Sequence, residues 1–201
     1  MRINEWKRLH LVLAATVVVF AQDVTKTERD QALKNLVDSR AGVVEAVKGL
    51  SEAQLKFKPG PDRWSVAETL EHIALTEDLF VNNIRPQLES STASISTRDA
   101  KEVDAMILTK VPDRSTKFQA PPPLVPTGRW TPQATLDHFL VSRQETISFL
   151  NSDHNLRDQV VNHPALGRLD GYQWVLAISA HSARHTKQIL EVKADPNFPA
   201  K

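Results

Sequence analysis

The chain has 201 residues, 41% of them hydrophobic, and a formal net charge of +1 at pH 7, which suits one compact domain with its own core. This near-neutral balance is unlike the basic footprint of a nucleic-acid-binding protein. No cysteine is present, so disulfides, thiolate metal ligands, a cysteine nucleophile and a lipid anchor on cysteine are excluded.

Residues 1–21 resemble an export signal. Three basic residues precede an almost unbroken apolar run over 11–21, and small residues, Val19 and Ala21, stand where a signal peptidase requires them. The apolar run is shorter than the roughly 20 residues that span a bilayer. We therefore expect cleavage after Ala21 and an exported mature protein, periplasmic or secreted, with no stable membrane insertion. An uncleaved N-terminal anchor is the alternative.

Two helices are predicted in the first half of the chain, over residues 25–50 and 65–87. Apolar residues recur at helical spacing in both, and each begins with a capping box, in which Ser or Thr is followed three residues later by Glu. His72 lies at the edge of the second helix's apolar face, where a lone histidine is more often structural than a ligand. Glu68, on nearly the same face, is a weak candidate for a catalytic base, although its capping role alone accounts for it.

The segment 89–130 is a long connection that is first polar and then rich in proline. A short helix is expected inside it, around 99–109. Connections of this length within a compact domain are usually functional covers or crossovers, and a loosely ordered linker is the alternative. The third helix is predicted over 131–151, beginning with a Thr-Pro pair. His138 points away from its apolar stripe and is rejected as a ligand.

The fourth helix, over residues 171–192, carries two histidines in the middle of its apolar face. That stripe consists of Trp174, Ile178, His181, His185, Ile189 and Val192. Histidines four residues apart on a helix can chelate one metal ion, but two core histidines bonded to backbone or buried water would give the same pattern. Gln188 lies on the same stripe and is a second weak candidate for a role in the chemistry, either binding a ligand or satisfying a histidine.

The pattern as a whole predicts an all-α protein, a four-helix bundle with a long crossover between helices 2 and 3. No internal repeat and no strand pattern of useful length is present, so we expect no sheet. The expected domains are a signal peptide over 1–21, the bundle over 22–193 and a disordered tail over 194–201.

Two segments carry a resemblance to a known family. FKPGPDRWSVAETLEHIA and HPALGRLDGYQWVLAISAHSARHTKQI are similar to the two signature regions of the DinB-like superfamily, and the likeness extends over about residues 25–193. The resemblance implies an up-down-down-up four-helix bundle. It also implies a metal site with one histidine from the second helix and two from the fourth, at the positions of His72, His181 and His185.

Members of that superfamily include metal-dependent hydrolases and transferases that use low-molecular-weight thiols, and many others have no assigned activity. The superfamily is predominantly cytoplasmic, so the export signal departs from it. This departure counts against the thiol-transferase role, because those thiols are intracellular. A purely structural bundle, whose histidines satisfy one another, is a further alternative.

Three neutral nitrogen ligands leave at least one coordination position open, as in catalytic rather than structural sites, and they suit a divalent ion of Zn, Ni or Fe. The zinc-protease pattern would place Glu directly after His181, where Ser182 stands instead. From the three-histidine site with its open position, we expect a metal-dependent hydrolase of a small-molecule substrate. No nucleic acid partner is expected, and a homodimer is one possible oligomeric state. A thiol-dependent S-transferase and a non-catalytic metal- or ligand-binding bundle are the alternatives.

Overall fold

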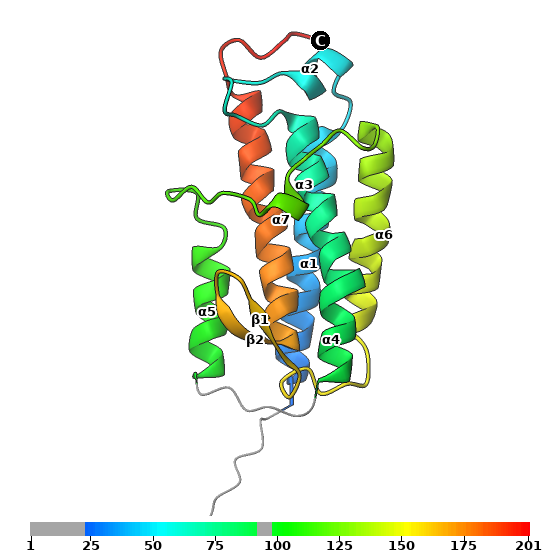
Figure 1. The fold of residues 1–201 in the computed structure, drawn as a ribbon, viewed down its shortest axis with the longest axis vertical. Coiled ribbons are helices and arrows are strands. Elements are labelled where there is room, and N and C mark those ends of the chain that lie inside the picture. Colours follow the sequence, from blue (N-terminus) through cyan, green and yellow to red (C-terminus); the bar gives the residue numbers. More distant parts are fainter. Residues whose placement is uncertain (1–22, 92–97) are drawn as a thin grey trace, which may run out of the picture.

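The computed structural model describes residues 23–91 and 98–201, and four long helices dominate it (Figure 1). They are α1 (Lys26–Val47), α3 (Val66–Leu79), α6 (Pro132–Leu150) and α7 (Gly171–Lys193). Figure 1 shows α1 and α7 running in one direction and α3 and α6 in the other, with the crossover between α3 and α6. The predicted up-down-down-up four-helix bundle is confirmed. The predicted signal peptide over 1–21 lies outside the described residues and stays a prediction.

The long helices begin where the sequence signals place them. Reciprocal capping boxes form at the start of α1, α3 and α7, and Thr131 caps α6 with Pro132 as its first residue. In each box the side chain of the capping residue accepts a backbone N–H that has no partner inside the helix. The start of each bundle helix is therefore set locally, before packing contributes.

The second bundle helix extends to Ser90, beyond its predicted end at residue 87. A π-helical turn, η1 (Phe80–Ile84), joins α3 to α4 (Arg85–Ser90), and the N–H of Arg85 bonds to the carbonyl of Phe80. Proline within an α-helix loses one hydrogen bond and clashes with the carbonyl four residues earlier. The wider π turn accommodates the ring, so the helix continues for one more turn.

The crossover between α4 and α6 contains the predicted short helix, here α5 (Ala100–Lys110), with Asp99 as its cap. α5 lies beside α7 (Figure 1). From its end the chain passes along α7 to a 3-10 turn, η2 (Pro122–Leu124), which contacts α3. The other short helix, α2 (Glu52–Lys56), lies between α1 and α3 in the chain.

The expectation that the protein has no sheet is wrong. Two short strands, β1 (Val160–His163) and β2 (Gly167–Asp170), form an antiparallel hairpin in which Val160 pairs with Asp170 and His163 with Gly167. Four residues are too few for an alternating pattern to be recognised in a sequence. Gly167 has φ +77°, a conformation that disfavours other residues, and so it closes the turn. The hairpin delivers the chain directly to Asp170, the cap of α7.

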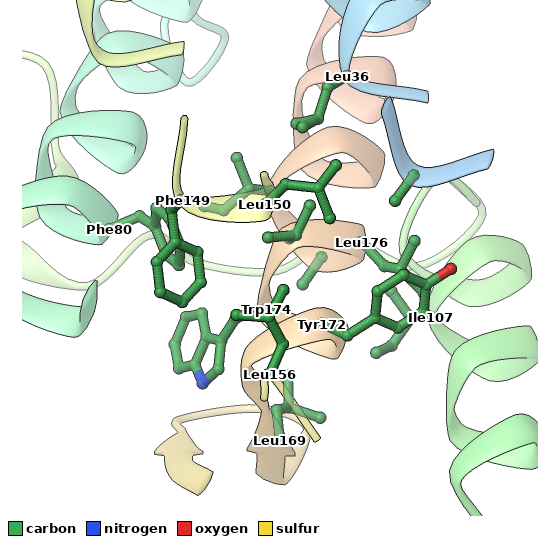
Figure 2. Packing of buried hydrophobic residues seen from close by; sticks show 14 of the residues in the cluster. Leu36, Phe80, Ile107, Phe149, Leu150, Leu156, Leu169, Tyr172, Trp174 and Leu176 are labelled. Carbon is green, nitrogen blue, oxygen red and sulfur yellow. The ribbon is translucent and has the colours of Figure 1, made fainter. Parts of the chain in front are cut away.

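The bundle encloses two apolar clusters. Figure 2 shows the larger one at the hairpin end, where Phe80 and Phe149 meet edge to face with ring centroids 5.6 Å apart and Trp174 lies beside them. The smaller cluster includes Val43, Leu70 and Phe139. No helix in the described part of the chain is both long and apolar enough to cross a membrane.

The C-terminal segment differs from the expected disordered tail over 194–201. Phe198 meets Phe57 edge to face, with ring centroids 5.6 Å apart, and joins the smaller apolar cluster. The amide of Gln54 in α2 donates to the carbonyl of Pro199 at 2.9 Å. An isolated aromatic residue without periodicity gives no helix or strand signal, yet it supplies enough apolar surface to hold a short segment against the bundle end.

Candidate metal centre

Three histidines from two neighbouring helices meet inside the bundle. His72 comes from the middle of α3, and His181 and His185 come from the face of α7 that packs against it. The two Nε2 atoms of His72 and His181 are 3.1 Å apart, and the ring centroid of His185 lies 4.5 Å from that of His72 and 4.4 Å from that of His181. One ring nitrogen from each lies within 4.8 Å of the other two.

Burial keeps these imidazoles neutral. His72 and His185 are only 4% and 8% exposed, and His181 is half-buried. Loss of solvation lowers the pKa of all three below the ordinary range, well below it for His181 and His185, and the neighbouring imidazoles lower the pKa of His181 further. A metal ion binding here at neutral pH would not have to displace a proton from a charged ring.

Two of the three rings have their outer nitrogen held by a hydrogen-bond partner. Nδ1 of His72 lies 2.8 Å from the backbone carbonyl of Leu124 in η2, and Nδ1 of His185 lies 2.9 Å from Oε1 of Gln188. A carbonyl only accepts, so Nδ1 of His72 carries the proton and its Nε2 presents a lone pair to the cluster. Such outer contacts orient the histidine ligands of metal sites.

The spacing of the rings fits a shared metal ion. Two nitrogens bound at about 2.0–2.1 Å in a tetrahedral site are about 3.3 Å apart, close to the 3.1 Å between the Nε2 atoms of His72 and His181. Among the residues that the structure describes, the group consists of three histidines and no carboxylate. This neutral, all-nitrogen set suits Zn, Ni or Fe rather than Mg or Ca, which prefer oxygen ligands.

Other candidates from the sequence have contacts of their own. Glu68 accepts the N–H of Ser65 at 2.8 Å and pairs with Lys58 at 2.7 Å, so its capping role is observed. His138 stacks on Trp130 with ring centroids 4.1 Å apart, and it is not part of the histidine group. Gln188 contacts His185, the second of the two roles that its position suggested.

The ring of Trp64 lies against that of His72, with centroids 4.8 Å apart. Leu124 and Arg114, both from the crossover, are contacts that the sequence does not reveal. Arg114 donates to Oε1 of Gln188 at 3.1 Å. The crossover has no periodicity from which such contacts could be derived. Its proline content and length were the only signals that it covers something.

Comparisons with known proteins agree with this architecture. Residues 35–189 match the sequence profile of the DinB superfamily. The chain is 25% identical over 158 residues to the uncharacterized protein YuaE from Bacillus subtilis, covering 78% of this chain and 93% of YuaE.

Two solved structures share the fold. YfiT from Bacillus subtilis, a probable metal-dependent hydrolase with an unusual four-helix bundle topology, superposes with a TM-score of 0.60 at 16% identity, covering 90% of this chain and 94% of YfiT. The four-helix bundle protein TT2238 superposes with a TM-score of 0.52 at 18% identity, covering 81% of this chain and 98% of TT2238. At these identities the likeness establishes the fold.

Proposed function

Because this chain belongs to the DinB superfamily, we propose that it is a metal-dependent hydrolase of a small molecule, with a divalent ion held by His72, His181 and His185. The observation that carries the proposal is the convergence of three neutral imidazoles within 4.8 Å. The inward-facing nitrogens of the buried rings have only one another as neighbours, such as the Nε2 atoms of His72 and His181 at 3.1 Å, and one metal ion would satisfy all three rings at once. The description of YfiT as a probable metal-dependent hydrolase supports the same function.

A divalent ion held by these three neutral nitrogens would supply Lewis acidity and would lower the pKa of water towards about 7. The chain's own residues provide the rest. The carbonyl of Leu124 and the amide of Gln188 orient two of the imidazoles, and the ring of Trp64 shields His72 from solvent. The crossover lies over the helices that carry the histidines, so we assign substrate selection to it.

The experiment begins with metal content. Wild-type protein purified without a histidine tag should contain about one divalent ion per chain after supplementation, and His185→Ala should lose most of its affinity while remaining folded. His138→Ala is the matched control, because it removes a histidine outside the group and should retain the metal. No metal in wild type, or equal metal in His185→Ala, would contradict the proposed site.

Turnover is tested on a panel of esters, amides and lactones. Metal-loaded wild type and His138→Ala should hydrolyse at least one class, and His181→Ala should lose the activity. Metal and ligand binding without turnover of any substrate would assign a non-catalytic binding protein in place of a hydrolase. Activity only with an added low-molecular-weight thiol would assign the transferase.

A further inference from the structure

The amide of Gln188 bridges a proposed metal ligand and an arginine from the crossover. Its Oε1 lies 2.9 Å from Nδ1 of His185 and accepts a hydrogen bond of 3.1 Å from Nη1 of Arg114. His185 and Gln188 are three residues apart on α7, whereas Arg114 lies beyond the end of α5. The contact therefore links the bundle to the crossover next to the metal centre.

Arg114 fixes which end of this amide faces His185. The oxygen and the nitrogen of a glutamine amide have nearly the same shape, so the orientation is decided by the hydrogen-bond partners. A guanidinium has only donors, and therefore the amide oxygen must face Arg114. The same oxygen faces Nδ1 of His185, which must then carry the proton. This leaves Nε2 of His185 with a free lone pair.

Arg114 is itself held in place. Its Nε and Nη2 donate to the two carboxylate oxygens of Glu191 at 2.6 and 2.7 Å, a bidentate pair with defined geometry. The loop that carries it is fastened to α7 as well. Arg184 donates to the carbonyl of Thr116 at 2.6 Å, and Lys187 donates to the carbonyl of Pro112 at 3.2 Å. The guanidinium that contacts Gln188 thus has little freedom to leave.

We propose that Arg114 is a positioning residue of the metal centre. Acting through Gln188, it holds His185 in the tautomer whose Nε2 can bind a metal. Without Arg114 the amide can rotate and offer its NH₂ group to Nδ1, which favours the tautomer with a proton on Nε2. The inference rests on the proposed metal site, but the tautomer of His185 is a property of the metal-free protein too.

The crossover acts on His72 in the same way. The carbonyl of Leu124 holds the proton on Nδ1 of that ring, so two of the three histidines are set by residues between α5 and α6. Docking of the crossover and metal affinity are then coupled, and by thermodynamic linkage each favours the other.

The first test measures the tautomer of His185 in metal-free protein by long-range proton–nitrogen NMR correlations. Wild type should show a protonated Nδ1, and Arg114→Met should show a mixture or the opposite tautomer. Arg63→Met is the matched control, because Arg63 lies 3.7 Å from Glu191 but has no bond to Gln188, so the wild-type tautomer should persist. An unchanged tautomer in folded Arg114→Met would overturn the inference. If that variant does not fold, Gln188→Met removes the acceptor and should have the same effect.

The second test is rescue. A carboxylate has only acceptors, so in the double variant Arg114→Met, Gln188→Glu either oxygen can accept the Nδ1 proton and no arginine is needed. Arg114→Met alone should lower metal affinity 10- to 100-fold, and the double variant should recover most of that loss. Loss without rescue would assign Arg114 a merely structural role. Absence of metal binding in wild type would overturn the proposed function, and the tautomer measurement would still decide whether Arg114 orients His185.

Discussion

At the scale of single residues, hydrogen bonds decide which nitrogen of a histidine carries the proton. His163 accepts the N–H groups of Ala165 and Leu166 at 3.1 and 3.2 Å through Nδ1, so this imidazole closes the hairpin turn. Its ring lies 4.9 Å from that of Trp174. Burial against this surface lowers the pKa of His163 to about 4. The ring is therefore neutral in the folded protein at pH 7.

The first prediction concerns stability against pH. Between about pH 6.5 and pH 4 the unfolded chain protonates His163 and the folded protein does not, so stability is full above pH 6.5 and is lost as the pH falls towards 4. His163→Asn keeps an acceptor for the turn and removes the titrating group, so its free energy of unfolding should fall less steeply over this window. Urea denaturation of metal-free protein at several pH values measures the slopes.

The control for this prediction is His154→Asn, a substitution at an exposed histidine in the loop between α6 and β1. It should reproduce the wild-type slope. Equal slopes in wild type and His163→Asn would show that His163 does not contribute to acid sensitivity.

The sequence identifies some histidines of the candidate site more clearly than others. His181 and His185 stand in a helical stripe, so their inward direction follows from periodicity alone. His72 needed the family resemblance, because a single histidine at the edge of a stripe has no such signal, and the structure shows it only 4% exposed. Arg114 and the carbonyl of Leu124 belong to a segment without periodicity, and only tertiary structure brings them to the site.

At the scale of elements, the capping boxes account for the accuracy of the predicted helix starts. They act over four residues and depend on no tertiary contact. The π turn before Pro86, the β1–β2 hairpin and the packed C-terminal segment were missed for the opposite reason. Each depends on contacts with the rest of the bundle or spans too few residues for a period to be recognised.

The second prediction separates the capping role of Glu68 from catalysis. Ser65→Ala removes the side chain that accepts the N–H of Glu68 at 3.1 Å, and it should lower the free energy of unfolding by about 1 kcal/mol. Glu68→Gln keeps an acceptor for the N–H of Ser65. It should change the free energy of unfolding by no more than about 0.5 kcal/mol and should leave the rate of hydrolysis unchanged. Chemical denaturation and the substrate panel provide the measurements. A large loss of turnover in Glu68→Gln at unchanged metal content would show that Glu68 is catalytic.

At the scale of the whole molecule, the neighbours in the bundle are not set by short loops. α1 lies beside α7 and α3 beside α6, each pair running in the same direction (Figure 1). Parallel neighbours require a long connection, which here is the crossover from α4 to α6. Apolar periodicity predicts four helices but not which of them are adjacent, because any arrangement can bury the same stripes. The family resemblance implies this topology. In the protein itself, a specific contact must stabilise it relative to the other possible arrangements of the four helices.

A buried polar cluster joins all four long helices and supplies such a contact. Arg143 of α6 is fully buried and pairs with Glu77 of α3. Its Nη1 donates to Ser39 of α1 at 2.7 Å, and its Nη2 donates to Ser182 of α7 at 2.9 Å. The hydroxyl of Ser182 therefore belongs to this polar cluster and is not part of the histidine group. A charge buried this deeply is tolerated only in the arrangement that brings all of its partners together.

The last prediction is a double-mutant cycle on this pair. Glu77→Leu leaves the buried guanidinium without its carboxylate and should lower the free energy of unfolding by about 3–5 kcal/mol. Arg143→Met should leave the carboxylate equally uncompensated.

The double variant removes both charges at similar side-chain volume. Two hydroxyls of the cluster keep hydrogen bonds within their own helices, Thr146 to the carbonyl of Ser142 at 3.1 Å and Ser39 to the carbonyl of Leu36 at 3.2 Å. It should therefore be more stable than either single variant, with a coupling free energy of about 2 kcal/mol or more. Additive losses in urea denaturation would show that the two charges do not act as a pair. Metal affinity should be unchanged in the double variant, because none of the metal-centre contacts involves Glu77 or Arg143 in the part of the chain that the structure describes.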